Sequence, residues 1–297
     1  MSASAVDAAP TVPFWRILIE LTKPRIISLL LVTTAAPMYV AGSPSWTLLL
    51  IVMVGGYLMA GGANAVNMYI DRDIDDHMAR TRLRPIPSGR MAAPAVLAFG
   101  IACATAATWL LAAFVNVLTA ALALGGFYCY VFVYTRWLKR ASPQNIVIGG
   151  AAGAFPPLVG WAAVTGEINL MGLLLFLIVF YWTPPHFWAL ALLKQRDYKK
   201  AGVPMAPLVW GERETMAQMR WYTVILLALT LLPVATGSLG ILYGAAALVL
   251  GALLLWGVWR LTPECEWTAP AWWVYKYSLL YLALLFVAMA LDKRMRF

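Results

Sequence analysis

The sequence predicts an all-α membrane protein, a polytopic bundle of about nine transmembrane helices around a central cavity. Hydrophobic residues make up 62% of the 297 residues and charged residues only 12%, and the mean hydropathy is +0.77. Soluble domains typically carry about 25% charged residues. The apolar residues also fall into separate runs of about 20, the length at which a helix crosses a bilayer. We therefore expect this chain to lie in a lipid bilayer.

The apolar runs define nine expected spans. They cover residues 26–42, 47–66, 94–113, 117–134, 145–164, 170–191, 219–237, 240–259 and 273–291. We expect residues 1–24 to form an N-terminal cytoplasmic segment and residues 25–297 to form a single intramembrane domain. Three scattered cysteines and two histidines provide neither a disulfide framework nor a histidine-ligated metal cluster.

The links between the spans alternate in length and charge. The short links at 43–46, 114–116 and 238–239 are uncharged, whereas long basic links follow the second, fourth and sixth spans. The positive-inside rule places the basic links in the cytoplasm, where two of them are expected to cap the cavity. The basic tail at 293–296 disagrees, because nine spans leave the C-terminus outside. A span miscounted near 260–291 is the alternative.

An acidic run follows the second expected span, where four of the thirteen acidic residues lie within six positions. Carboxylates are costly beside hydrocarbon, so their clustering indicates a bound cation. Asn67, Asp71 and Asp75 have i, i+4, i+8 spacing, which places their oxygens along one helical face. Such oxygens suit Mg²⁺, which usually binds one or two carboxylates together with phosphate oxygens. Asp73 and Asp76 point elsewhere and are expected to be solvated or ion-paired.

Basic residues follow these acids and recur after the sixth span. Arg80 and Arg84 belong to a run of arginines whose guanidinium groups suit phosphate oxygens. The link after the sixth span offers Asp197 as an opposing metal ligand, with Lys194 and Lys199 as anion donors. Together the two links predict a diphosphate site bridged by metal. The alternative is a basic, orienting loop whose acids merely balance its arginines.

The run Asn67–Gly89 resembles the first aspartate-rich motif of the intramembrane prenyltransferase superfamily, N-D-x-x-D-x-x-x-D followed by R-T-x-x-R-P-x-P-S-G. Met68 stands where most members have an acid, and Ala201 replaces the last acid of the second motif, D-x-x-x-D. These departures, with the runs Ala201–Met205 and Tyr181–Leu190, resemble the heme-farnesylating branch of the superfamily. The resemblance extends from about residue 20 to the last span.

The resemblance implies a prenyltransferase domain that transfers a farnesyl group from farnesyl diphosphate to the vinyl group of protoheme IX. Water adds in the same reaction, and the products are heme O and diphosphate. Mg²⁺ is the implied cofactor, whereas heme B is a substrate. The setting is a prokaryotic inner membrane, with active-site loops in the cytoplasm. Heme A synthase and terminal oxidase assembly factors are candidate protein partners, and no nucleic acid is expected.

The resemblance also implies roles for single residues. Asn67, Asp71 and Asp197 would hold Mg²⁺, and Asp75 would hold a second ion or orient the first. Tyr198 would face the allylic cation that forms when diphosphate leaves. The implied substrate-binding residues are Arg80, Arg84, Lys194, Lys199 and His186.

His186 lies in an apolar span after two prolines. An ionisable residue inside a membrane indicates function, and here the function would be contact with the heme iron or a propionate. The alternative is a histidine satisfied by a backbone carbonyl. His77 lies in a polar loop and is expected to be solvated.

Two other functions compete with heme farnesylation. The first is prenylation of a quinone precursor or a chlorophyll-type tetrapyrrole, although Met68 and Ala201 disfavour it. The second is a transporter or a heme-handling assembly factor. Transporters place polar groups near the membrane midplane, whereas these acids lie at one border.

Overall fold

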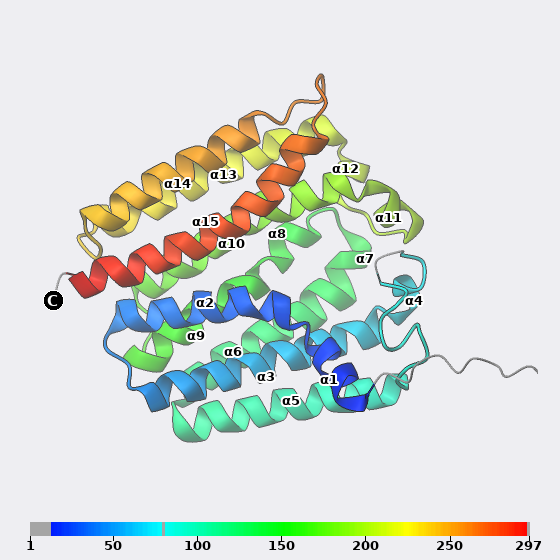
Figure 1. Ribbon diagram of the computed structural model, residues 1–297, viewed down its shortest axis with the longest axis horizontal. Helices are drawn as coiled ribbons and strands as arrows, with labels where there is room; N and C mark the ends of the chain where they lie inside the picture. The colour runs from blue at the N-terminus through cyan, green and yellow to red at the C-terminus, as the bar shows by residue number, and fades with distance from the viewer. Residues whose placement is uncertain (1–12, 79–80, 296–297) are drawn as a thin grey trace, which may run out of the picture.

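The computed structural model describes residues 13–78 and 81–295, which form an elongated helical bundle (Figure 1). Nine helical segments in this part of the chain are long and apolar enough to cross a membrane, which confirms the expected number of spans. The spans are α2 (Pro24–Ala41), α3 (Trp46–Ile70), α5 (Ala93–Phe114), the run of α6 (Val117–Tyr128), η1 (Cys129–Leu138) and α7 (Lys139–Ala141), the pair α8 (Asn145–Gly149) and α9 (Ala151–Thr165), α10 (Leu170–Leu193), α13 (Glu212–Ala235), α14 (Ile241–Trp259) and α15 (Thr268–Met295). Four short helices accompany them: α1 (Phe14–Thr22), α4 (Arg72–Asp75), α11 (Gln195–Lys200) and α12 (Ala206–Val209).

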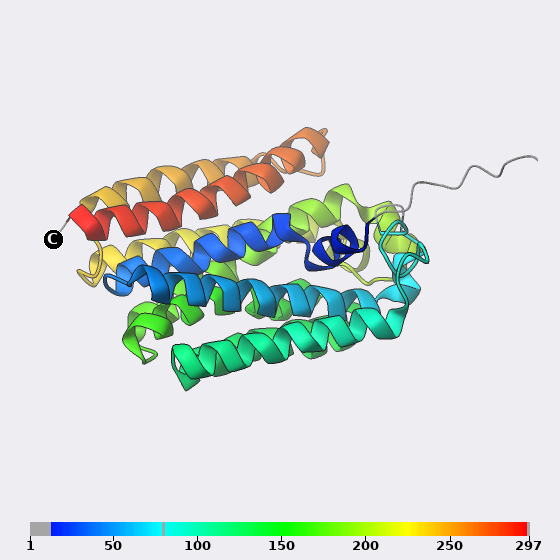
Figure 2. The ribbon, with the colours of Figure 1, turned by 60° about the horizontal axis from the view of Figure 1, so that its bottom comes forward.

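Neighbouring spans close into a ring. Contacts run from α2 to α3, α5, α6, α9, α10, α13, α14 and α15, and α15 returns to α2. Further contacts join α2 to α9 and α10 to α15. The long helices run along one common direction in both views (Figures 1 and 2). The largest buried cluster includes Trp188 of α10, Tyr243 of α14, and Tyr281 and Phe286 of α15.

Three spans begin at a capping residue in a short link. Ser45 precedes α3, Asn116 precedes α6 and Asn169 precedes α10, and each side chain accepts a hydrogen bond from the backbone N–H three residues later. Such a cap satisfies one of the N–H groups that a helix leaves unpaired at its start. The short links therefore fix where these helices begin.

Small residues allow the closest helix pairs to approach. A Cβ atom on Gly62 of α3 would lie 2.6 Å from the backbone oxygen of Gly100 of α5. On Gly160 of α9 it would lie 2.0 Å from the oxygen of Thr34 of α2. Neither contact leaves room for a side chain, so these pairs require glycine.

The basic links and the basic C-terminal turn lie at opposite ends of the bundle. The short helices α4 and α11 lie at one end, and α15 finishes at the other (Figures 1 and 2). Lys293 and Arg294 therefore lie away from the basic links, so the structure supports nine spans despite the basic tail. The neighbouring Asp292 is buried and accepts hydrogen bonds from the N–H groups of Gly240 (2.6 Å) and Tyr243 (3.1 Å), which caps α14.

Candidate active site

The row Asn67, Asp71 and Asp75 continues in helical register past the end of α3. The N–H of Asp71 donates to the carbonyl of Asn67 at 2.9 Å, and the N–H of Asp75 donates to the carbonyl of Asp71 at 2.8 Å. All three residues are buried, with exposed fractions of 4%, 1% and 1%. Asp73 and Asp76 are exposed. The expected single face of oxygen donors is therefore formed.

Cations from other segments hold the two buried carboxylates. Lys139 Nζ lies 2.5 Å from Asp71 Oδ2, and Arg84 Nη1 donates to both oxygens of Asp75 at 2.8 and 2.6 Å. Arg140 Nη2 lies 3.9 Å from Asp71 Oδ1. Removing a carboxylate from water is costly unless a positive group pairs with it. These ion pairs therefore explain how Asp71 and Asp75 can be buried.

A π-helical segment presents Lys139 to this row. Residues Cys129–Leu138 form η1 in the second half of the fourth span, and Lys139 follows directly. Within η1, Thr135 Oγ1 donates to the carbonyl of Tyr130 at 2.8 Å and accepts from Asn67 Nδ2 at 3.1 Å. π-Helical turns are rare and frequently mark functional sites. Neither this segment nor the role of Lys139 was predicted from the sequence, which indicated only a basic, orienting link there.

Lys23, between α1 and α2, joins the same charge cluster. Its Nζ lies 3.2 Å from Asn67 Oδ1. Burial lowers the pKa of Lys23 well below its usual value, and the positive charges of Arg84 and Lys139 lower it further. Three basic side chains, Lys23, Arg84 and Lys139, thus surround two buried carboxylates, and their N–H groups suit an added anion.

The donor set fits a hard cation that shares its ligands with phosphate. Asp71 Oδ1 is buried and has no hydrogen-bond partner, so one carboxylate oxygen is left for a further ligand. The described residues contain no group of three or more His, Cys, Asp or Glu that could hold a metal. Mg²⁺ here would therefore draw on few carboxylates, on the amide oxygen of Asn67 and on phosphate, the mixture that Mg²⁺ commonly accepts.

The second predicted loop lies at the same end of the bundle as the first, where α11 and α4 appear together (Figure 1). Asp197 in α11 is half-buried, and its carboxylate forms no ion pair among the described residues. Tyr198 is buried in the core, whereas Lys199 is exposed. Lys194 Nζ lies 6.0 Å from the ring centre of Trp272. Arg80 lies outside the described residues.

His186 is packed between aromatic rings in the C-terminal half of α10. Its ring centre lies 4.4 Å from that of Trp182 and 5.0 Å from that of Tyr275, both nearly parallel to it. His186 Nδ1 is hydrogen-bonded to Ser278 Oγ of α15 at 2.7 Å. The Ser278 hydroxyl and the backbone of Tyr275 are both hydrogen-bond partners of this histidine, which is close to the backbone alternative that the sequence left open beside heme contact. His77 is exposed, as expected.

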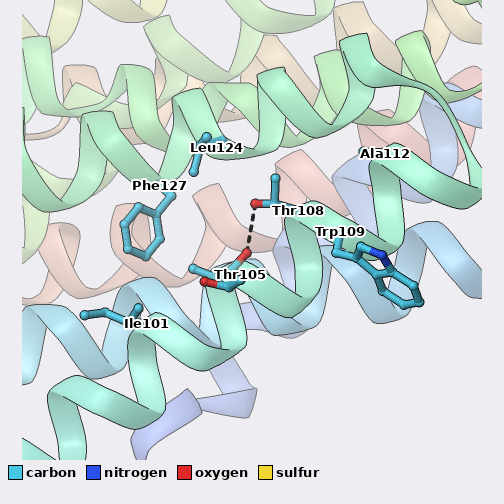
Figure 3. A pocket seen from close by; sticks show the side chains of 8 residues that line it. Ile101, Thr105, Thr108, Trp109, Ala112, Leu124 and Phe127 are labelled. Carbon is cyan, nitrogen blue, oxygen red and sulfur yellow. Dashed lines mark hydrogen bonds between the residues drawn. The ribbon is translucent and has the colours of Figure 1, made fainter.

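A groove on the outer face of the bundle lies between α5 and α6 (Figure 3). It is lined by Ile101, Ala104, Thr105, Thr108, Trp109, Ala112, Leu124 and Phe127. The lining residues are uncharged, and the Thr108 hydroxyl donates a hydrogen bond to the carbonyl of Ala104 at 2.8 Å. This groove therefore faces the expected lipid and contributes nothing to the charged cluster.

The fold and the site define a multi-pass membrane protein with buried carboxylates and excess basic charge at one membrane border. A sequence profile described as the UbiA prenyltransferase family matches residues 29–280. The chain belongs to this family.

Two curated relatives are called protoheme IX farnesyltransferase. The one from Roseiflexus castenholzii is 56% identical over 277 residues, which are 93% of this chain and 52% of the relative. The one from Synechococcus sp. (strain JA-2-3B'a(2-13)) is 51% identical over 276 residues, which are 92% of this chain and 83% of the relative. The chain thus spans about half the length of the first of these relatives.

The fold is also similar to a solved structure described as a UbiA homolog from Archaeoglobus fulgidus bound to DMAPP and Mg²⁺. The TM-score is 0.67 at 14% identity, and the match covers 91% of this chain and 99% of the other. This likeness confirms the bundle architecture.

Proposed function

We propose that this chain transfers a farnesyl group from farnesyl diphosphate to the vinyl group of protoheme IX. A carbon–carbon bond forms between the allylic carbon and the vinyl group, water supplies a hydroxyl to the other vinyl carbon, and diphosphate leaves. The products are heme O, diphosphate and a proton. The observation that carries this proposal is the buried row of Asn67, Asp71 and Asp75. One oxygen of Asp71 lacks a hydrogen-bond partner, and this oxygen and the surrounding cations suit a metal-bound diphosphate.

The relatives support both halves of the reaction. The Roseiflexus and Synechococcus proteins are called protoheme IX farnesyltransferases, which supports heme B as acceptor. The Archaeoglobus fulgidus protein was solved with DMAPP and Mg²⁺, which supports a prenyl diphosphate donor and a magnesium requirement.

The acidic residues would serve the diphosphate end of the substrate. Asn67, Asp71 and Asp197 would hold Mg²⁺, and Asp75 would hold a second ion or orient the first. When bound, Mg²⁺ neutralises diphosphate and makes it a better leaving group. The free carboxylate of Asp197 supports this assignment.

Basic residues would stabilise the charge that builds up on the departing diphosphate. Arg84, Lys23 and Lys139 lie in the charge cluster, so we add the two lysines to the residues that the sequence indicated. Arg80, Lys194 and Lys199 complete the proposed anion-binding set. Each of these groups can donate hydrogen bonds to phosphate oxygens.

The apolar part of the site would receive the isoprenoid and the heme. Tyr198, in α11 of the second loop, is buried and would offer its ring to the allylic cation. His186 would contact heme from its aromatic stack, with Ser278 holding the ring orientation. The site would face the cytoplasm from the inner membrane of a prokaryote, where heme A synthase or oxidase assembly factors could take up the product.

The test is an acceptor assay with the purified full chain. Farnesyl diphosphate and Mg²⁺ are supplied with either heme B or 4-hydroxybenzoate, and extracted products are separated by chromatography. We expect heme O from heme B and no product from 4-hydroxybenzoate. Asp71→Ala and Asp197→Ala should abolish heme O, whereas the exposed Asp73→Asn should retain it. Prenylated 4-hydroxybenzoate, or full activity in both alanine variants, would refute the proposal.

A further inference from the structure

A second pocket lies on the outer face of the bundle, apart from the acidic row. It is lined by Ala217, Arg220, Trp221, Val224 and Trp259. The first four belong to the early turns of α13, and the last is the final residue of α14. These turns lie at the same end of the bundle as α4 and α11 (Figure 1). The pocket therefore opens at the membrane border that carries the basic links.

Arg220 is held in this pocket but not neutralised. Its Nη2 donates to the carbonyl of Leu261 at 2.6 Å, and its guanidinium carbon lies 5.9 Å from the ring centre of Trp259. Its Nε is buried without a hydrogen-bond partner, and no carboxylate pairs with it among the described residues. An arginine has five N–H donors, so most of its capacity remains unused. A guanidinium that is held in place and has unused N–H groups can bind an anion.

The acids on the neighbouring link are engaged elsewhere. Glu264 lies 3.8 Å from Arg213, and Glu266 accepts a hydrogen bond from the N–H of Thr268 at 2.9 Å. Arg260, next to Trp259, lies 4.8 Å from the ring centre of Trp256. Within the described part of the chain, Arg220 and Arg260 therefore contact tryptophan rings but form no ion pair with a carboxylate.

The rim of the pocket is aromatic and apolar. Trp221 is 67% exposed and Trp259 is 50% exposed, and Val224 continues the apolar surface toward the bilayer interior. Tryptophan favours the headgroup level of a membrane, where one side of the ring meets lipid and the other meets water. A ligand here would have its anion at Arg220 and its apolar part along α13.

We propose that this pocket binds the phosphate headgroup of an anionic membrane phospholipid. Arg220 donates to the phosphate oxygens, Arg260 adds positive charge, and an acyl chain lies against Trp221 and Val224. Basic pockets beside membrane helices recognise such headgroups through this combination of charge and apolar contact. A soluble phosphate would use only the charged half of the pocket, which is why the lipid is the occupant we assign.

The occupied pocket would brace the junction between three helices. Arg220 already links α13 to the carbonyl of Leu261, in the link between α14 and α15. A lipid on Arg220 binds only the folded arrangement and therefore raises the melting temperature. This stabilisation is separate from farnesyl transfer, because no lining residue belongs to the proposed active site.

The test is lipid titration of the full chain in a neutral detergent. Phosphatidylglycerol, phosphatidylcholine with identical acyl chains, and inorganic phosphate are compared by melting temperature, and bound lipid is counted by native mass spectrometry. We expect phosphatidylglycerol to bind and stabilise most, and inorganic phosphate to do neither. Arg220→Gln should weaken phosphatidylglycerol binding about fivefold. The matched control Arg213→Gln, on the same helix but outside the pocket, should bind like the wild type.

Equal phosphatidylglycerol binding in the wild type and Arg220→Gln would overturn the proposal. So would equal binding of phosphatidylcholine, and stabilisation by inorganic phosphate would show a site for a soluble anion. Trp221→Ala keeps the test decisive if Arg220→Gln does not fold, because the Trp221 side chain is largely exposed. That variant should also bind phosphatidylglycerol more weakly, and unchanged affinity would contradict the assignment.

Discussion

Lys139 Nζ lies 2.5 Å from Asp71 Oδ2, although 68 positions separate the two residues in the chain. The pair joins η1 and α7 to the end of α3. Asn67 Nδ2 donates to the same oxygen at 2.7 Å, while Asp71 Oδ1 has no hydrogen-bond partner. One oxygen of a buried carboxylate is thus fully engaged and the other is left for a ligand.

The first prediction concerns the stability of this pair. Lys139→Met leaves Asp71 as a buried charge with only a distant arginine, so it should cost about 3–5 kcal/mol of folding stability. The double variant Asp71→Asn/Lys139→Met should recover much of this loss. Thermal unfolding in detergent measures both. An unchanged melting temperature in the single variant would show that Lys139 does not compensate Asp71.

The second prediction is a pH dependence. Hydrogen bonds from Arg140 lower the pKa of Asp73 from 3.8 to about 2. Because this pKa is lower in the folded chain, the pair stabilises the fold above about pH 4, and the effect disappears as the pH falls toward about 2. The difference in melting temperature between wild type and Asp73→Asn should follow that course. It should also be small, because Asp73 is exposed. A difference that grows on acidification would contradict the assigned pair.

The third prediction tests whether the hydroxyl of Thr135 orients Asn67 or whether Thr135 serves only in packing. Thr135→Val removes the hydroxyl that accepts from Asn67, so Asn67 is oriented less well. The Mg²⁺ concentration needed for half-maximal activity should rise about tenfold, with a smaller change in kcat. Thr108→Val is the matched control, because it deletes a threonine hydroxyl in the uncharged groove of Figure 3. If both variants shift the Mg²⁺ requirement equally, Thr135 has no special role.

The fourth prediction distinguishes the two interpretations of His186. His186→Phe preserves a stacked ring between Trp182 and Tyr275 but removes the polar nitrogens. The KM for heme should rise about tenfold or more, while the KM for farnesyl diphosphate should stay unchanged. A change confined to the melting temperature would assign His186 to packing alone.

The sequence predicted the spans because the length of an apolar run decides whether a helix can cross a bilayer. It also predicted the row Asn67, Asp71 and Asp75, since helical spacing is a local property. Convergence of distant segments is not local, and the roles of Lys23 and Lys139 were therefore missed. The π-helical turns that present Lys139 have no clear sequence pattern. The sequence showed only that the segments around Lys23 and Lys139 are both basic.

The central claim is that a divalent cation at Asp71 activates farnesyl diphosphate. Release of diphosphate, measured during a Mg²⁺ titration with heme B present, tests it most directly. We predict that release depends on Mg²⁺ in the wild type and in Asp73→Asn, and falls at least about 100-fold in Asp71→Asn and Asp197→Asn. Undiminished release in folded Asp71→Asn, or release that persists after chelation of all divalent cations, would contradict the claim.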